Sequence, residues 1–181
     1  MLSLWHTIRV LSIFIFLAAL PFATVLKIIN KIKKRSLWLI CESPDTARDN
    51  GYHLYKYMKQ EHPEKYSFYV IDKKCSDYQK VSGLGNIIEY YSFKHWIYYL
   101  AADINISSQK AGNPNAVLFY VLQVLLGVWK NKRVFIQHGI TKDDAKWLYY
   151  DTCKFSLFIC GAKKEYEFIK SKFGYPEENL K

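Results

Sequence analysis

From residue 36 onward, short runs rich in β-branched and aromatic residues alternate with segments of helical periodicity. Parallel strands need long crossover connections, and helices supply them, so this alternation is typical of a parallel sheet covered by helices. Six runs are expected to be strands: 37–41, 67–71, 86–90, 104–107, 134–137 and 155–160. The sequence therefore predicts an α/β fold with a parallel sheet flanked by helices.

The segments between these runs contain helix-starting and helix-ending residues. Asp49 precedes a helix expected to run to about His62, where Pro63 stops it, and Ser92 precedes another. Further helices are expected at 116–129 and 163–173, and 73–85 is expected to be a loop with at most one helical turn. The segment 116–129 is apolar nearly all round, which favours a buried or membrane-facing position.

The first 35 residues have a different composition from the rest of the chain. They hold six basic residues and no acidic one, so most of the formal net charge of +10 lies there. Residues 10–26 are uncharged and mostly apolar. We expect residues 1–35 to form a membrane-associated helix with a basic flank, and residues 36–181 to form the folded domain.

The length of the apolar segment leaves two arrangements open. As a helix it would reach about 25 Å, slightly less than a hydrocarbon core of about 30 Å, and Pro21 would kink it. It either spans the membrane, extended by Ile28 and Ile29, or lies in the interface with its basic flank on anionic head groups. In both arrangements the basic cluster favours the cytoplasmic face of the cell membrane. A cleaved signal peptide is the third alternative, but there the strongest charge precedes the apolar run.

The run at 134–137 ends in Gln137-His138-Gly139. In parallel α/β sheets the carboxyl ends of the strands open onto the ligand crevice, and a glycine lets the backbone turn sharply and approach a substrate. His138 is therefore a candidate catalytic residue. The alternative is a structural histidine at the rim of the sheet.

The loop that follows the first predicted strand, residues 42–51, is unusually polar. Free backbone amides at a helix amino terminus bind anions, and Arg48 beside them is suited to a phosphate. Asp49 and Asn50 belong to the same candidate site. The alternative is a solvated loop in which Asp49 only caps the helix and Arg48 pairs with Glu42 or Asp45.

Several classes of site are disfavoured by the sequence. Gly83-Leu84-Gly85 lacks the third glycine of a dinucleotide fingerprint and follows no strand directly, so no nicotinamide cofactor is expected. The histidines and cysteines lack metal-ligand spacing, and we expect no metal. The aromatic residues fall at core or interface positions, and the basic excess lies in the first 35 residues, so nucleic-acid binding is not expected.

The chain resembles the CDP-glycerol glycerophosphotransferases of teichoic acid and capsular polysaccharide biosynthesis. Three features together carry the resemblance: the apolar and basic leader, the segment Ala47-Arg48-Asp49-Asn50-Gly51 and the turn Gln137-His138-Gly139. The resemblance covers residues 36–181. It implies the GT-B arrangement of two Rossmann-like domains facing each other across a cleft. The amino-terminal domain handles the membrane-bound acceptor, and the carboxyl-terminal domain binds CDP-glycerol.

By this resemblance His138 is the general base for a glycerol hydroxyl of the acceptor, a role that suits an imidazole because it is partly unprotonated near neutral pH. Arg48 and Asn50 would lie on the acceptor side, Lys142 would steer phosphate, and Gly139 would allow close approach. The partners implied are CDP-glycerol, a lipid-linked polymer acceptor and the membrane surface, with no cofactor.

The resemblance also implies a second domain, with its own histidine and nucleotide-binding residues, which is expected beyond residue 181. We therefore expect the chain to be the acceptor-side half of the enzyme and to be inactive alone. Many relatives follow the His-Gly pair with threonine and proline, whereas Ile140-Thr141-Lys142 stands here and fits capsule-type relatives better. Two alternatives stay open: a sugar-nucleotide GT-B glycosyltransferase, and a non-catalytic membrane-anchored binding module.

Overall fold

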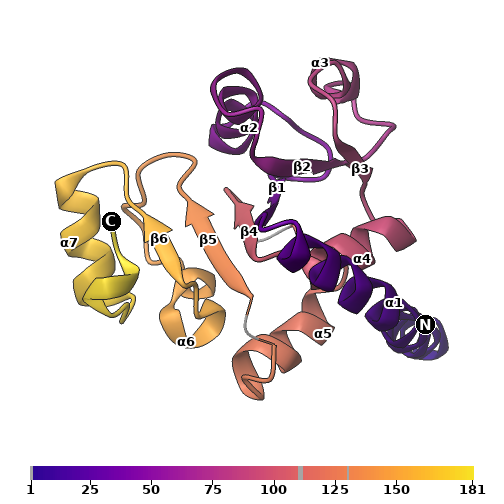
Figure 1. Cartoon of the computed structure of the whole chain (residues 1–181). Coiled ribbons are helices and arrows are strands. Elements are labelled where there is room, and N and C mark those ends of the chain that lie inside the picture. Colours follow the sequence, from indigo (N-terminus) through magenta and orange to yellow (C-terminus); the bar gives the residue numbers. More distant parts are fainter. Residues whose placement is uncertain (1, 110–111, 130) are drawn as a thin grey trace.

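The computed structural model describes residues 2–109, 112–129 and 131–181. These residues form a six-stranded, wholly parallel sheet in the order β3-β2-β1-β4-β5-β6 (Figure 1). The strands are β1 Leu37–Cys41, β2 Tyr66–Ile71, β3 Ile87–Glu89, β4 Ile104–Ser107, β5 Lys132–Ile136 and β6 Leu157–Ile159. The predicted α/β fold with a Rossmann-like parallel sheet is confirmed, because each expected strand is present with its ends shifted by at most two residues.

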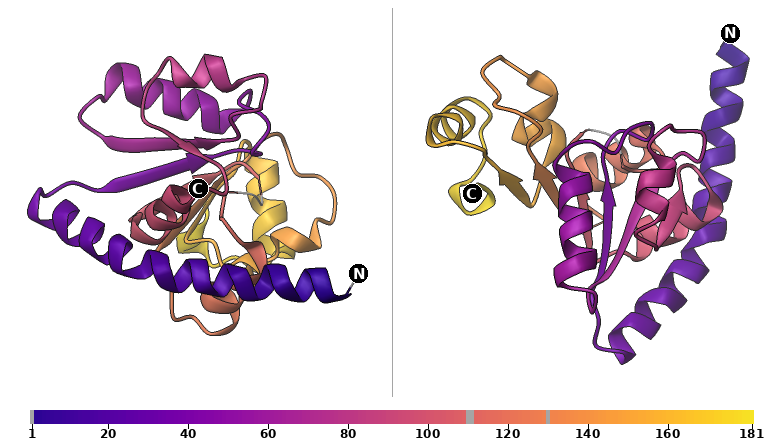
Figure 2. Two further views of the ribbon diagram at one scale, coloured as in Figure 1. Left: turned by 90° about the vertical axis from the view of Figure 1, so that its right-hand side faces the viewer. Right: turned by 90° about the horizontal axis from the view of Figure 1, so that it is seen from above.

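The helices lie on both faces of this sheet. Their bounds are α1 Leu2–Ile32, α2 Asn50–Glu61, α3 Tyr78–Ser82, α4 Phe93–Ala101, α5 Ala116–Tyr120, α6 Tyr150–Cys153 and α7 Lys163–Lys172. A π-helical turn, Val121–Leu125, extends α5, and two 3-10 turns lie at Lys146–Leu148 and Glu177–Asn179. The views in Figures 1 and 2 place α2 and α3 on one face of the sheet, and α1, α4 and α5 on the other.

Strand β1 shows why both faces need covering. Leu37 and Leu39 lie in a core cluster that includes residues of α1, α4 and α5, whereas Ile40 lies in a second cluster with residues of α2. Successive side chains of a strand point to opposite faces, so a strand that is apolar at every position is buried on both. A third cluster, centred on Phe135 and Phe158, joins β5 and β6 to α7.

Helix α1 packs along the body of the domain (Figure 2). Ala19 and Ala23 are buried in the first core cluster, and the ring of Phe16 meets Phe119 and Trp129 edge to face. The opposite side of α1 is apolar and exposed, including Phe14, Leu17 and Val25, among others. Residues Leu11–Ile32 are long and apolar enough to cross a membrane by length and composition.

The long helix expected at 116–129 is wrong in its extent. Asn115 caps α5 by accepting a hydrogen bond from the Leu118 amide at 2.9 Å, but the α-helical part ends at Tyr120. The chain then widens into the π-helical turn and leaves the helical path at Gly127, whose φ of 62° lies in the left-handed region. The buried residues of this segment are Phe119, Gln123 and Val124, whereas residues such as Val117, Leu125 and Leu126 are exposed.

Candidate functional site

His138 lies two residues beyond the end of β5, at the carboxyl edge of the sheet, and its side chain is exposed. Its Nδ1 atom is 2.7 Å from the carbonyl oxygen of Ser108, just after β4. A carbonyl oxygen only accepts, so Nδ1 carries the proton and Nε2 of the neutral ring presents a lone pair. Apart from its two neighbours in the chain, no atom of the described residues lies within 4 Å of where a Cβ of Gly139 would stand, so this part of the structure leaves space beside Gly139.

Behind His138 lies a buried polar pair, Gln137 and Glu165. The Gln137 side-chain oxygen accepts from the His138 amide at 3.1 Å, and its nitrogen donates to Glu165 at 2.8 Å. The Glu165 carboxylate also accepts from the backbone amides of Thr141 and Gly161, both at 2.6 Å. One buried carboxylate of α7 therefore fixes the loops that follow β5 and β6.

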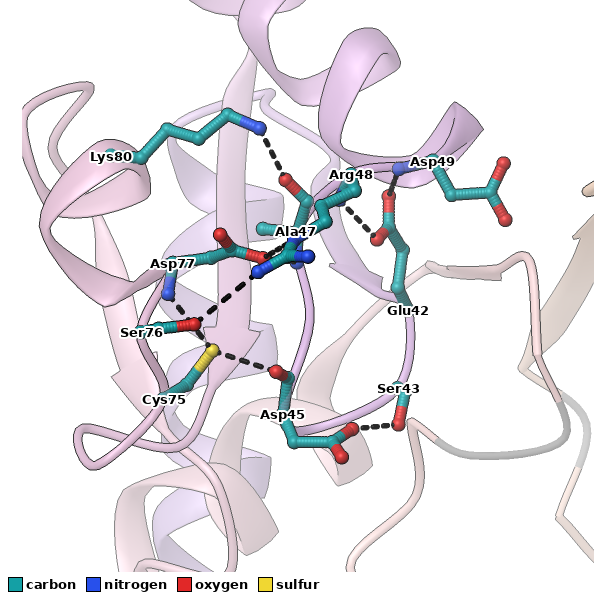
Figure 3. Close-up of polar contacts among 10 residues, drawn as sticks. All are labelled: Glu42, Ser43, Asp45, Ala47, Arg48, Asp49, Cys75, Ser76, Asp77 and Lys80. Atoms are coloured by element: carbon teal, nitrogen blue, oxygen red, sulfur yellow. Dashed lines mark hydrogen bonds and ion pairs between the residues drawn. The ribbon is translucent and has the colours of Figure 1, made fainter.

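A second buried carboxylate, Glu42, organises the loop after β1 (Figure 3). It accepts from three backbone amides: Arg48 and Asp49 at 3.0 Å, and Tyr52 at 2.5 Å. The amide of Asn50 is bonded to the side chain of Asp49, the N-cap of α2. Four of the amides in which the sequence suggested an anion site, those of residues 48, 49, 50 and 52, are thus bonded within the chain.

Arg48 pairs with Asp77, and not with Glu42 or Asp45, the two acids that the sequence suggested. Its guanidinium Nε donates to the carboxylate of Asp77 at 2.7 Å, and Asp77 also accepts from the Ala47 amide (Figure 3). The Arg48 hydrogen bond lowers the pKa of the Asp77 carboxyl below its usual value. The Arg48 side chain is 66% exposed, whereas that of Asp77 is 13% exposed. The guanidinium is therefore exposed to solvent while a largely buried carboxylate holds it in place.

Asn50 connects the loop after β1 to the loop that carries His138. Its side-chain amide donates to the backbone carbonyl of Gln137, next to His138 in the chain. The candidate residues Asn50 and His138 are therefore brought together, with Ser108 contributed by the strand between them in the sheet. Lys142 lies on the same loop as His138 and Gly139 and is exposed.

The fully buried His95 of α4 joins two loops, one after β3 and one after β4. Its Nδ1 accepts from the Tyr91 amide, and its Nε2 donates to the Gly112 carbonyl, both at 3.3 Å. Burial lowers the pKa of His95 to about 4, so the ring is neutral. A buried, neutral imidazole whose two nitrogens bond to backbone atoms has a structural role. Among the described residues no group of His, Cys, Asp and Glu side chains could hold a metal ion.

Four residues that hold the site together are not among those expected from the sequence: Glu42, Asp77, Ser108 and Glu165. For Glu42 and Glu165 a signal was present, because each is an acid next to a strand end or in the first turn of a helix. Such acids accept from free amides. The contributions of Asp77 and Ser108 depend on contacts across 29 and 30 residues of sequence, which no local pattern contains.

The chain is similar in sequence to known proteins. Residues 22–177 match the family model described as CDP-Glycerol:Poly(glycerophosphate) glycerophosphotransferase. The chain is also 29% identical over 153 residues to the minor teichoic acid biosynthesis protein GgaB of Bacillus subtilis (strain 168). That match covers 81% of this chain and 17% of the relative, so the chain spans less than a fifth of the relative's length.

Proposed function

Since the chain belongs to the CDP-glycerol:poly(glycerophosphate) glycerophosphotransferase family, we propose that it is the acceptor-side domain of a membrane-associated enzyme of teichoic acid or capsule biosynthesis. The complete enzyme transfers glycerol phosphate from CDP-glycerol to a lipid-linked polymer. In this proposal CDP-glycerol is held by a second domain in a GT-B arrangement, and the residues around His138 act on the acceptor.

The observation that carries the proposal is the orientation of His138. With Nδ1 donating to the Ser108 carbonyl, Nε2 is the ring nitrogen left at the exposed carboxyl edge of the sheet, and in the neutral ring it carries the free lone pair. There it takes the proton of a terminal glycerol hydroxyl on the acceptor as that oxygen attacks the β-phosphorus of CDP-glycerol. The new oxygen–phosphorus bond replaces the bond to the bridging oxygen between the two phosphates, and CMP leaves with that electron pair.

The remaining candidate residues are assigned to the acceptor's phosphates. Arg48 offers an exposed guanidinium held by Asp77, and Lys142 offers an exposed ammonium on the His138 loop. Asn50 and Asp49 set the position of that loop against α2, and Gly139 leaves space for the attacking alcohol. A polymer of phosphodiesters needs such cations near its growing end because it carries a charge at each unit.

The membrane part of the proposal is supported by α1, whose outer side leaves large apolar side chains such as Phe14, Leu17 and Val25 more than half exposed. The basic residues that follow this apolar segment favour the cytoplasmic face of the cell membrane. An enzyme that draws CDP-glycerol from the cytoplasm and elongates a lipid-linked polymer needs both its substrates at that surface.

The test is replacement of His138 by alanine in the complete enzyme. We expect turnover to fall between a hundredfold and ten-thousandfold, with folding and acceptor binding retained, because a general base contributes about that much. Replacement of the exposed His53 on α2 by alanine is the matched control and should leave turnover unchanged. Unchanged turnover of His138→Ala would remove the base and favour a non-catalytic binding module.

The expectation that the 181-residue chain is inactive alone has its own test. The purified chain is incubated with CDP-glycerol and a lipid-linked acceptor, and released CMP is measured. No release is expected without the second domain, and clear turnover by the isolated chain would contradict the division of roles. Competition by CDP-glycerol against sugar nucleotides in the complete enzyme separates this activity from that of a glycosyltransferase.

A further inference from the structure

A hollow of about 740 Å³ lies at the amino edge of the sheet, opposite the edge that carries His138. Residues at the end of α1 and at the starts of β1, β4 and β5 line it. In parallel α/β sheets the reaction takes place at the carboxyl edge, so this hollow is separate from the proposed active site. Neither the His-Gly turn nor the loop after β1 contributes to it.

The hollow is strongly basic. Its lining contains five cationic side chains, Lys27, Lys31, Lys34, Arg35 and Lys132, against the single carboxylate of Asp103. One oxygen of that carboxylate already accepts from the Leu37 amide at 2.8 Å. Among the described residues none of the five cations forms an ion pair with an acid. Such a concentration of one charge attracts anions.

Two buried hydrogen-bond donors in the lining lack an acceptor. Neither the side-chain nitrogen of Asn30 nor the indole nitrogen of Trp129 has a partner within the described part of the chain. Asn30 is only 3% exposed, and its oxygen is already bonded to Arg35. Buried polar groups are normally paired, and both unpaired atoms here are donors, so a ligand that meets them has to offer an acceptor such as a phosphate oxygen.

The surface beside the hollow favours a membrane lipid as the source of such an acceptor. Ile28 and Ile32 of α1 and Val128 are exposed by 53%, 75% and 64%. Lys27 lies over the ring of Trp129 at 5.1 Å, so a cation and an aromatic ring meet between the apolar surface and the basic hollow. Exposed apolar residues next to lysines and a tryptophan are typical of protein surfaces that lie in a membrane interface.

We propose that the basic hollow binds the phosphate head group of an anionic membrane lipid, with the lipid chains against the exposed apolar side of α1. The proposal rests on the membrane association in the proposed function and adds a specific phosphate site to it. It also orients the domain, because α1 and the amino edge of the sheet then face the lipid. The chemistry at His138 is not involved.

The test is binding of the purified chain to vesicles of phosphatidylcholine mixed with phosphatidylglycerol, measured by co-sedimentation. Replacing both Lys31 and Lys34 by glutamine should weaken binding by roughly 30-fold, since each lysine near an anionic surface contributes about fivefold. The matched control replaces Lys163 and Lys164 of α7, which changes the net charge equally and should leave binding within about twofold.

Trp129→Phe separates a specific phosphate site from diffuse attraction, because it removes the indole donor without changing the charge. Binding should weaken about tenfold, the loss expected for one hydrogen bond to a charged acceptor. Trp147→Phe is the control for loss of an indole away from the hollow. Circular dichroism and the unfolding midpoint of each variant establish that it is folded.

Three results would overturn the proposal. The first is an equal loss for the Lys163/Lys164 and Lys31/Lys34 pairs, which would mean diffuse attraction. The second is unchanged binding by Trp129→Phe, which would mean diffuse attraction, or apolar insertion where binding to phosphatidylcholine alone is equal. The third is full displacement by soluble glycerol phosphate, which would mean a site for free phosphate. None of these results bears on turnover, so the proposed function is tested separately.

Discussion

Replacement of Glu42 by glutamine tests whether a buried carboxylate fixes the loop after β1. In the structure one carboxylate oxygen accepts from the amides of Asp49 and Tyr52, and the other accepts from Arg48. Glutamine keeps a single acceptor oxygen, so its amide nitrogen has to face the Arg48 amide, donor against donor. An unsatisfied buried amide costs about 1–3 kcal/mol. Loss of the negative charge at the start of α2 adds about 0.5–1 kcal/mol.

Glutamine offsets part of this cost because burying a neutral side chain is less unfavourable than burying a carboxylate. We therefore expect the free energy of unfolding to fall by about 2–3 kcal/mol and the melting temperature by about 5–10 °C. The measurement is thermal and urea unfolding of the purified chain, followed by circular dichroism. Glu64→Gln, at an acid whose side chain is 63% exposed, is the matched control and should change the stability by less than about 0.5 kcal/mol.

Gly51→Ala gives an independent reading of the same contact. A Cβ at Gly51 would lie 2.8 Å from the Cγ atom of Glu42, so alanine must push the carboxylate from its amides. The two replacements should then destabilise by less in combination than the sum of their separate effects. Two results would contradict this role of the carboxylate: a melting temperature of Glu42→Gln equal to that of the wild type, or changes in the free energy of unfolding that simply add in the double variant.

Three further outcomes are expected. Burial holds the pKa of His95 at about 4, against 6.5 in the unfolded chain, so the unfolded chain binds one more proton between these pH values. The free energy of unfolding should therefore be constant above about pH 6.5 and fall by about 3 kcal/mol on acidification to pH 4. Urea unfolding measures this dependence, and His95→Gln should abolish it. Glu165→Gln should lower turnover of the complete enzyme tenfold to a hundredfold because it loosens the loop that carries His138. Glu167→Gln, on the exposed side of α7, is the control and should leave turnover unchanged. Equal effects of the two replacements would contradict the role of Glu165. Arg48→Ala removes an exposed ion pair and should cost less than about 1 kcal/mol of stability while raising the KM for the acceptor; an unchanged KM would exclude Arg48 from acceptor binding.

The proximity of the candidate residues could be anticipated only in part. The carboxyl ends of parallel strands share an edge, so any parallel sheet places the loops after β1 and β5 on the same side. Which strand lies between them is set by the order β1-β4-β5, and that order brings Ser108 to the ring of His138. The pairing of Arg48 with Asp77 likewise depends on where α3 packs, and the sequence offered the nearer acids Glu42 and Asp45 instead.

The helices also show which features the local sequence predicts and which depend on tertiary packing. The helix after Asp49 and the one after Ser92 begin where the capping residues predict, because a cap acts within a few residues of sequence. The segment 116–129 has helical periodicity throughout but remains α-helical only to Tyr120. Packing of its buried side on the sheet and the turn at Gly127 override the local pattern there.

The sequence by itself determined the class of fold, the positions of the strands, the apolar character of α1 and the His-Gly turn, because periodicity, capping and composition act over a few residues. The tertiary structure decided which partners the polar side chains have. Glu42 and Glu165 fix the loops, Ser108 selects the proton position on His138, and the end of α1 meets the starts of three strands to form a basic hollow. These arrangements join residues far apart in the chain, and only the packing of helices on the sheet brings such residues within bonding distance.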